Sequence, residues 1–165
     1  MISEQNSIKR GVVETACLMI VAAKTAPKAR GIDNVVAVVL SEKEELEKLA
    51  SKMEELAEKY GEFFKRDANN VRNSDAVVLI GCKIEDLGLK TPEGWRIDSN
   101  TVNSLVNLGI ALGSAAKIAS IHNVDNRIMF SVGVAAQELG LVDADVVYGI
   151  PLSARAKNIY FDRRR

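Results

Sequence analysis

The sequence contains only two cysteines, Cys17 and Cys82, and a single histidine, His122. Two thiols cannot form the disulfide framework of a small secreted domain. Without a nearby histidine they also cannot complete a tetrahedral zinc site within one chain. The 22 basic and 22 acidic residues cancel, so no global field draws the chain to nucleic acid or to an anionic membrane. We therefore expect a cytoplasmic protein that binds neither nucleic acid nor a membrane.

Long hydrophobic runs and the common phosphate and metal motifs are also missing. The longest apolar runs are broken by Glu14 and Lys24, well short of the roughly 20 residues that a membrane span requires. The polar N-terminus lacks the basic start of a signal peptide. There is no glycine-rich dinucleotide fingerprint, no Walker loop and no HExxH motif. These absences favour a soluble protein whose ligand, if any, is held by residues outside such motifs.

Apolar periodicity predicts helices that alternate with buried strands. The 3–4 spacing of amphipathic helices occurs in residues 3–24, 41–60, 100–121 and 127–139. Apolar, β-branched runs predict three strands, and the first reads as buried on both faces: Val35–Leu40, Asp75–Lys83 and Asp145–Ile150. Residues 62–74 are polar and are predicted to be irregular, whereas residues 84–99 form an exposed connection. This order predicts one mixed α/β sandwich domain over residues 1–165.

Several helix ends carry capping signals. Ser41 and Glu44 form a capping box that opens the second helix. Asp125 or Asn126 is expected to N-cap the last helix, and Gly140 at the C′ position ends it. The third helix carries small residues, which usually let another backbone approach closely, at Gly109, Ala111, Gly113 and Ala115.

The segment AAKTAPKARGIDN, residues 22–34, is the first candidate binding loop. It joins a helix to a strand, and it carries Lys24, Lys28 and Arg30 next to Asp33 and Asn34. A connection needs turn formers, but it does not need three cations beside a carboxylate and an amide. That mixture is typical of a loop that grips a flat anionic ligand such as a flavin phosphate. A solvated surface loop is the alternative that spacing alone favours slightly.

Three other stretches carry polar groups. FFKRDANNVRN, residues 63–73, suits either recognition of a planar heterocycle or the capping of neighbouring elements. His122 is either a general acid or base or, as we favour, a helix C-terminal cap. The turn from Gly149 to Pro151, followed by Arg155 and Lys157, suits an anionic ligand. The final residues 163–165 are expected to be a solvated tail.

Four long stretches together resemble one family. They are AAKTAPKARGIDN, FFKRDANNVRNSDAVVLIG, NLGIALGSAAKIASIHNVDNR and ELGLVDADVVYGIPLSARAKNIYFDR. They resemble uncharacterised prokaryotic proteins described as containing a ferredoxin domain, and the likeness spans nearly the whole chain. More distantly, the layout is similar to the nitroreductase-like FMN-binding fold. That fold implies an α+β, three-layer sandwich with a central mixed sheet flanked by helices.

The nitroreductase-like resemblance implies a flavin site between the two subunits of a homodimer, with the 100–121 helix at the interface. Ala26 and Pro27 match the family's flavin loop, whereas Lys28, Gly31 and Asp33 replace its serine, asparagine and glutamine. The N-terminal Arg-x-Ser-x-Arg phosphate grip is absent. The implied cofactor-binding residues are Lys28, Arg30, Gly31, Asp33, Asn34, Asn123, Asp125, Gly149, Pro151 and Lys157. Lys28, Arg30 and Lys157 would hold the phosphate or ribityl group, and Asp33 and Asn34 would approach the ring.

Three functions are compatible with this resemblance. The first is an FMN-dependent oxidoreductase, in which the protein orients the flavin and the cofactor supplies the chemistry. The second is a non-enzymatic dimeric binding or scaffold protein that keeps the fold without redox chemistry. A weaker third is a sensor of another anionic nucleotide. No catalytic residue is assigned.

The ferredoxin description depends on cysteines that such relatives usually carry after the strand equivalent to Asp75–Lys83. Here Cys82 is followed by no further cysteine, and an iron–sulfur cluster needs about four thiolates. We therefore predict no cluster in this protein. Cys82 is either a lone redox thiol or, as we favour, a buried structural residue.

Overall fold

The computed structural model describes residues 1–161. The elements follow the chain in this order: α1 (Glu4–Thr25), η1 (Ala29–Gly31), β1 (Val35–Leu40), α2 (Lys43–Tyr60), α3 (Phe63–Arg72), β2 (Ala76–Cys82), α4 (Ser99–Ile121), β3 (Asp125–Asn126), α5 (Phe130–Glu138) and β4 (Val146–Ser153). The four strands within the described residues form one antiparallel sheet in the order β1-β2-β4-β3.

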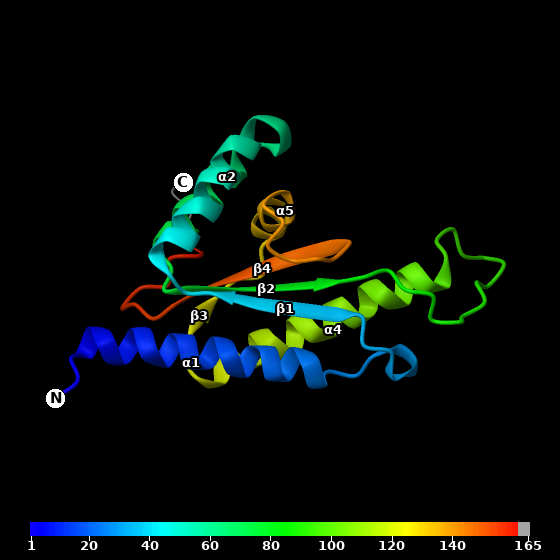
Figure 1. Cartoon of the computed structure of the whole chain (residues 1–165), viewed down its shortest axis with the longest axis horizontal. Helices are drawn as coiled ribbons and strands as arrows, with labels where there is room; N and C mark the ends of the chain where they lie inside the picture. Colours follow the sequence, from blue (N-terminus) through cyan, green and yellow to red (C-terminus); the bar gives the residue numbers. More distant parts are fainter. Residues whose placement is uncertain (162–165) are drawn as a thin grey trace.

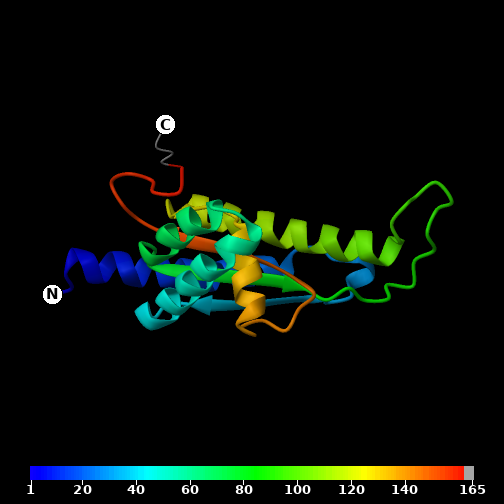
Figure 2. The same ribbon diagram turned by 90° about the horizontal axis from the view of Figure 1, so that it is seen from above.

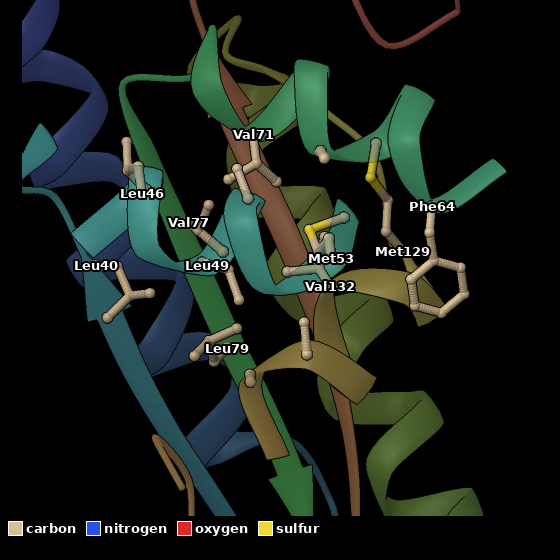
Figure 3. Close-up of a cluster of buried hydrophobic side chains, with 14 of the residues drawn as sticks. Leu40, Leu46, Leu49, Met53, Phe64, Val71, Val77, Leu79, Met129 and Val132 are labelled. Carbon is tan, nitrogen blue, oxygen red and sulfur yellow. The ribbon is translucent and has the colours of Figure 1, made fainter. Parts of the chain in front are cut away.

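Helices cover both faces of this sheet, which gives three layers (Figure 1). On one face α1 and α4 pack against alternate sheet residues such as Val78 and Ile80. On the other face α2, α3 and α5 pack against Val77 and Leu79, together with Phe64 and Val132 (Figure 3). Every residue of β2 is buried, as expected for a strand that has neighbours on both edges and helices on both faces. The predicted α+β three-layer sandwich is confirmed.

The strand register defines two ends of the sheet that matter for function. Val35, Cys82 and Val146 share one terminal row, and Leu40, Val77 and Pro151 share the row near the other end. We call the first row the arm end, because residues 84–98, which we call the arm, leave the sheet there. We call the second row the tail end, because β4 continues there into residues 154–161. At roughly 3.4 Å per residue the two rows lie about 17 Å apart.

Two strand predictions need correction. All four strands pair antiparallel, so the sheet is not mixed within the described residues. The strand β1 is not buried on both faces, because it lies at the edge of the sheet and leaves Val36 and Val38 about one-third exposed, at 37% and 36%. Whether a strand lies at the edge of a sheet depends on which distant segments pair with it, and a local run of apolar residues does not indicate that pairing.

Residues 63–72 form a helix instead of the predicted irregular segment. Phe64, Ala68 and Val71 are buried at helical spacing, but polar residues occupy most of the other positions and mask the period. One of them, Asp67, is buried as well, and it accepts hydrogen bonds from Arg66 and from Ser131 of α5. This carboxylate therefore joins two helices.

Helix ends were predicted with mixed success. His122 is the C-cap residue of α4, and Gly140 has a φ of +65° just beyond α5, both as predicted. The capping box of α2 uses Glu42 and Glu45 instead of Ser41 and Glu44. Asp125 and Asn126 do not cap α5. They form β3, and α5 begins three residues later than predicted, at Phe130.

The helix α4 is the one helix within residues 1–161 that is long and apolar enough to cross a membrane by length and composition. Eight of its residues are nevertheless buried in this protein, and they pack against α1 and β2. The apolar residues of α4 therefore form part of the core on one face of the sheet.

We predict that close helix–sheet contact makes Gly133 of α5 irreplaceable. A Cβ at this position would lie 1.8 Å from the carbonyl oxygen of Val147, so Gly133→Ala should destabilise the protein by about 1–3 kcal/mol or more. Gly11 of α1 is the matched control, because a Cβ there meets no atom within 4 Å. Gly11→Ala should stabilise by about 0.5–1 kcal/mol through helix propensity. Urea unfolding measures both changes, and equal effects of the two substitutions would contradict the packing.

Candidate functional site

The predicted cofactor-binding residues separate into two groups at opposite ends of the sheet. Lys28, Arg30, Gly31, Asp33 and Asn34 precede β1 at the arm end. Asn123, Asp125 and Lys157 lie next to β3 and beyond β4 at the tail end, near Pro151. Gly149 lies between them in β4, where Val132 of α5 packs against its Cα. One chain therefore does not bring the ten residues into a single site.

A buried amide network holds the arm end together. The Asn34 side chain donates to the carbonyl of Lys83 (2.8 Å) and accepts from the Asn107 amide of α4 (3.0 Å). Asn107 in turn accepts from the backbone N–H of Ala29 (2.8 Å). Asn34 is 4% exposed and Asn107 is 2% exposed. The Asn34 amide thus contacts the protein's own polar groups on both sides.

The cations of the arm end contact backbone carbonyls and a carboxylate of the same chain. The Lys28 ammonium donates to the carbonyls of Ala23 (3.2 Å), Lys24 (2.7 Å) and Ala26 (2.9 Å). It therefore caps the C-terminus of α1, where positive charge is favourable. Burial lowers the pKa of Lys28, against the opposing effect of the Asp33 charge.

The rest of the 22–34 segment is also fixed by local contacts. Lys24 forms an ion pair with Asp33, and the hydrogen bond between them lowers the pKa of Asp33. Arg30 and Gly31 both have positive φ, at +56° and +69°, and Arg30 donates to the carbonyl of Leu87 (2.9 Å) in the arm. Beside this loop, a shallow concavity of about 350 Å³ is lined by Ile20, Ala23, Lys24, Val35, Val36 and Ala37.

At the tail end a concavity of about 460 Å³ is lined mostly by polar side chains, and we call it the amide concavity: Ser120, Asn123, Val124, Asp125, Asn126, Asn158 and Phe161. Asn158 donates to the Asp125 carboxylate (3.0 Å). The Arg127 guanidinium lies over the Phe161 ring at 5.2 Å. Amide groups with an aromatic wall are suited to reading the edge and face of a planar heterocycle.

A second concavity of the tail end, of about 520 Å³, is lined by cations, and we call it the cationic concavity: Arg72, Asn73, Ser74, Arg155, Ala156, Lys157 and Ile159. Arg155 makes a bidentate contact with Asp75 (2.7 and 2.9 Å), and this hydrogen bonding raises the pKa of Arg155. Arg72 is paired with Glu47 and Glu54. Both arginines are therefore paired with carboxylates of the same chain, and the three cations together supply the kind of hydrogen-bond donors that bind a phosphate.

The segment that follows β4 contributes residues to both concavities. Lys157 lines the cationic concavity, and Asn158 and Phe161 line the amide concavity. Between them the buried Tyr160 anchors the segment, because its hydroxyl lies 2.9 Å from the Ser74 hydroxyl and its carbonyl accepts from Arg127. Burial raises the pKa of Tyr160 to about 12, so the phenol stays protonated at neutral pH.

The predicted cofactor-binding residues did not include Asn158 or Phe161, and they did not include Arg72, although the 63–73 stretch was considered as a recognition segment. Asn158 directly follows Lys157 in the motif ARAKNIYF, so extending the candidate list along that motif would have found it. Arg72 belongs to the segment misread as irregular. His122 lines neither concavity and is the C-cap of α4.

The three-layer fold is shared with solved structures of nitroreductase-like proteins. A nitroreductase family protein from Clostridium novyi is 15% identical, with a TM-score of 0.64 over 88% of this chain and 77% of that protein. The hypothetical oxidoreductase YcnD from Bacillus subtilis is 16% identical, with a TM-score of 0.61 over 88% of this chain. The NADPH:FMN oxidoreductase from Vibrio harveyi, solved with NAD⁺, is 17% identical, with a TM-score of 0.59 over 92% of this chain. The chain spans 58% of the Bacillus protein and 63% of the Vibrio protein, which is less than two thirds of either.

Sequence relatives are more similar than these structures but carry no assigned activity. An uncharacterised protein from Archaeoglobus fulgidus is 39% identical, and the match covers 99% of this chain and 97% of that protein. Residues 98–163 match the family described as "Uncharacterized protein containing a ferredoxin domain (DUF2148)". With a nitroreductase-like fold and a full-length relative at this identity, the chain belongs to this ferredoxin-domain-containing family.

Proposed function

We propose that the protein binds FMN at the tail end of the sheet and acts as a flavin-dependent oxidoreductase of the cytoplasm. The observation that carries this proposal is a pair of concavities that share the segment after β4 as a wall, one lined by cations and one lined by amides. FMN has the same two parts, an anionic phosphate and a planar ring with hydrogen-bonding edges. The nitroreductase-like fold supports the proposal independently.

The residues of the tail end fit the parts of FMN as follows. Lys157, with Arg155 beside it, would hold the phosphate through charge-assisted hydrogen bonds. Asn123 and Asp125 would face the polar edge of the ring, and Phe161 would cover part of its face. Bound FMN would supply the hydride chemistry that these side chains lack. The protein's own contribution is orientation, charge neutralisation and exclusion of water.

The residues of the arm end enter this proposal through a homodimer. The outward face of α4 has exposed apolar and small residues at helical spacing, Leu105, Val106, Gly109, Ile110 and Gly113. A Cβ on either glycine would meet no atom within 4 Å, so this face has room for a second helix. Two copies packed antiparallel on α4 place opposite ends side by side. The loop with Lys28, Arg30, Gly31, Asp33 and Asn34 of one copy would then lie towards the tail end of the other.

An iron–sulfur cluster does not fit the cysteines of this chain. Cys17 is exposed on α1, whereas Cys82 is buried in β2. Burial, with a smaller contribution from the Asp145 charge, raises the pKa of Cys82 to about 11, which opposes the thiolate form that iron requires. Within residues 1–161 no cluster of three or more His, Cys, Asp or Glu side chains suits a metal ion. We therefore propose a function without a cluster.

A non-enzymatic dimeric binding or scaffold protein is the second candidate. The observation that favours it is the arm end, where Lys28 and Asn34 are hydrogen-bonded within the chain. Such a protein would use the α4 face and the concavities for assembly without turnover.

Flavin titration separates the two candidates. FMN fluorescence should be quenched on binding, and Lys157→Gln should weaken FMN binding about 10-fold, which corresponds to about 1.4 kcal/mol. Riboflavin lacks the phosphate, so its affinity should be unchanged by Lys157→Gln. Exposed Lys48 of α2 is the matched control, and Lys48→Gln should affect neither ligand. Lys28→Gln measured alongside tests the predicted phosphate role of Lys28. Absence of FMN binding at high micromolar concentration would leave the non-enzymatic candidate.

Iron analysis and thiol labelling test the interpretation of the cysteines. We expect no stoichiometric iron or sulfide, and four iron atoms per chain would contradict it. At about pH 8 a thiol reagent should label Cys17 in the native protein and both cysteines after unfolding. The folded Cys17→Ser variant should therefore remain unlabelled.

The buried Cys82 also predicts a pH dependence of stability. Because the folded state raises the pKa of Cys82 from 9.0 to about 11, the contribution of the protonated thiol to the free energy of unfolding is present below pH 9 and is lost as the pH rises towards 11.

A further inference from the structure

The strand β1 is an unprotected edge of the sheet. It is the outer strand in the order β1-β2-β4-β3, and within residues 1–161 no strand pairs with its open side (Figures 1 and 2). Edge strands of monomeric proteins usually carry a charged side chain, a proline or a bulge that prevents pairing with another chain. Residues 35–40, VVAVVL, have none of these, and their pairing with β2 is continuous. An apolar edge of this kind is a predicted site of association.

Alternate residues of β1 present their backbone groups to the open edge. The N–H of Lys83 donates to the carbonyl of Asn34 (2.9 Å), which is therefore a hydrogen-bonded pair of the β1–β2 ladder. Because such pairs alternate along antiparallel strands, the outward groups belong to Val35, Ala37 and Val39. The Val35 N–H already donates to the carboxylate of Asp33. The outward groups from the carbonyl of Val35 to the N–H of Val39 remain, and Ala37 lies in their middle.

The sequence of this edge is self-complementary about Ala37. The five residues from Val35 to Val39 read VVAVV in both directions. In an antiparallel pair of β1 strands with a two-fold axis at Ala37, each Ala37 would face the same residue of the second copy and exchange hydrogen bonds with it. The N–H of Val39 would donate to the carbonyl of Val35 in the second copy. The same register places Val36 against Val38, so apolar side chains meet apolar side chains.

The side chains along this edge are open to such a partner. Val36 and Val38 are 37% and 36% exposed, and they alternate with the residues of β1 that pack towards α1. The shallow concavity of about 350 Å³ beside the 22–34 loop runs along the same edge, with Ile20 of α1 on one side and Ala37 on the other. Val21, which follows Ile20 in α1, is 58% exposed. A second copy would cover these apolar groups.

The position of α1 also fits a second copy. This helix packs on both β1 and β2 (Figure 1), so its axis lies about half a strand spacing, roughly 2.4 Å, inside the edge. One further strand spacing of about 4.8 Å separates the two β1 strands, which puts the two α1 helices roughly 10 Å apart. Packed helices have axes about 8–10 Å apart. Edge-to-edge pairing therefore brings the two α1 helices to packing distance without a clash.

We propose that two copies of the chain pair edge to edge through β1, with Ala37 opposite Ala37, so that their two sheets form one continuous antiparallel sheet. The edge is then covered by the same edge of a second copy. This surface is separate from the outward face of α4, and the inference rests neither on FMN binding nor on the α4 homodimer. Pairing through β1 alone gives a dimer, and pairing through both surfaces gives a tetramer.

Two single-cysteine variants test the register. In a Cys17→Ser background, Val36→Cys and Val38→Cys are co-expressed. Residues 36 and 38 of different copies form a non-hydrogen-bonded pair, whose Cα atoms lie about 4.5 Å apart, within the range of a disulfide. Two copies of the same variant place their cysteines on the diagonal, at about 7–8 Å, which a disulfide does not span. Mild oxidation should therefore give a covalent dimer of mixed composition, and each variant expressed alone is the matched control that should not.

Light scattering tests the contact without engineered thiols. Val38→Lys places a charge on the edge, as natural edge strands do, and it should halve the mass of the assembly. Because Val38 is exposed, the far-UV circular dichroism should be unchanged. Tyr60 of α2 has nearly the same exposure, 37%, and Tyr60→Lys should leave the mass unchanged.

A substitution on α4 separates the two interfaces. Ile110 is 39% exposed on the outward face of α4. A mass that falls with Ile110→Glu but not with Val38→Lys, without a mixed disulfide, would overturn the β1 contact and leave the α4 homodimer. A mass that falls with Val38→Lys but not with Ile110→Glu would support the β1 contact and overturn the α4 homodimer. A disulfide of equal yield in the mixture and in each variant alone would overturn the register, and a protein that is monomeric at all concentrations would overturn both interfaces.

Discussion

The hydrogen bond between the buried amides of Asn34 and Asn107 holds four separate parts of the chain in one arrangement. Through it α4 is joined to the start of β1, to the residue after β2 and to the loop that follows α1. The two amide side chains are buried, so leaving either of them unpaired would cost about 1–3 kcal/mol. The network therefore fixes the arm end of the sheet, and the base of the arm is held beside it by Asn100 and by Arg30, which donates to the carbonyl of Leu87.

The tail end is organised differently. Its polar groups surround two concavities and also bond within the chain: Asn158 donates to Asp125 and accepts from the N–H of Tyr160, and Asn126 donates to the carbonyl of Val124. The neutral net charge of the whole chain does not reveal where the charges lie: cations gather around residues 72 and 155–157, and Glu47 and Glu54 of α2 pair with Arg72 there. Charge at a site depends on which segments the fold brings together, and for this chain those segments are more than 80 residues apart.

Much of the fold could be predicted from the sequence because apolar spacing is local. The cores of α1, α2, α4 and β2 follow from it directly. The internal partners of the Asn34 amide could not be predicted because Lys83 and Asn107 lie 49 and 73 residues away, and no local pattern distinguishes a ligand-binding amide from one that joins core segments. The helix α3 was missed for a related reason, since Asp67 is polar yet buried against α5. The contacts of polar residues that form hydrogen bonds across the fold are therefore the hardest to predict from sequence spacing.

The separation of the candidate residues argues for a site shared between two copies. Arg30 and Lys157 of one chain lie beyond opposite ends of the sheet, whose two defining rows are about 17 Å apart. An antiparallel pair removes this separation, because each end meets the opposite end of the second copy. The two-fold operation of the proposed homodimer would therefore account for both the bare face of α4 and the divided set of cations, and flavin binding would then depend on protein concentration through the dimer.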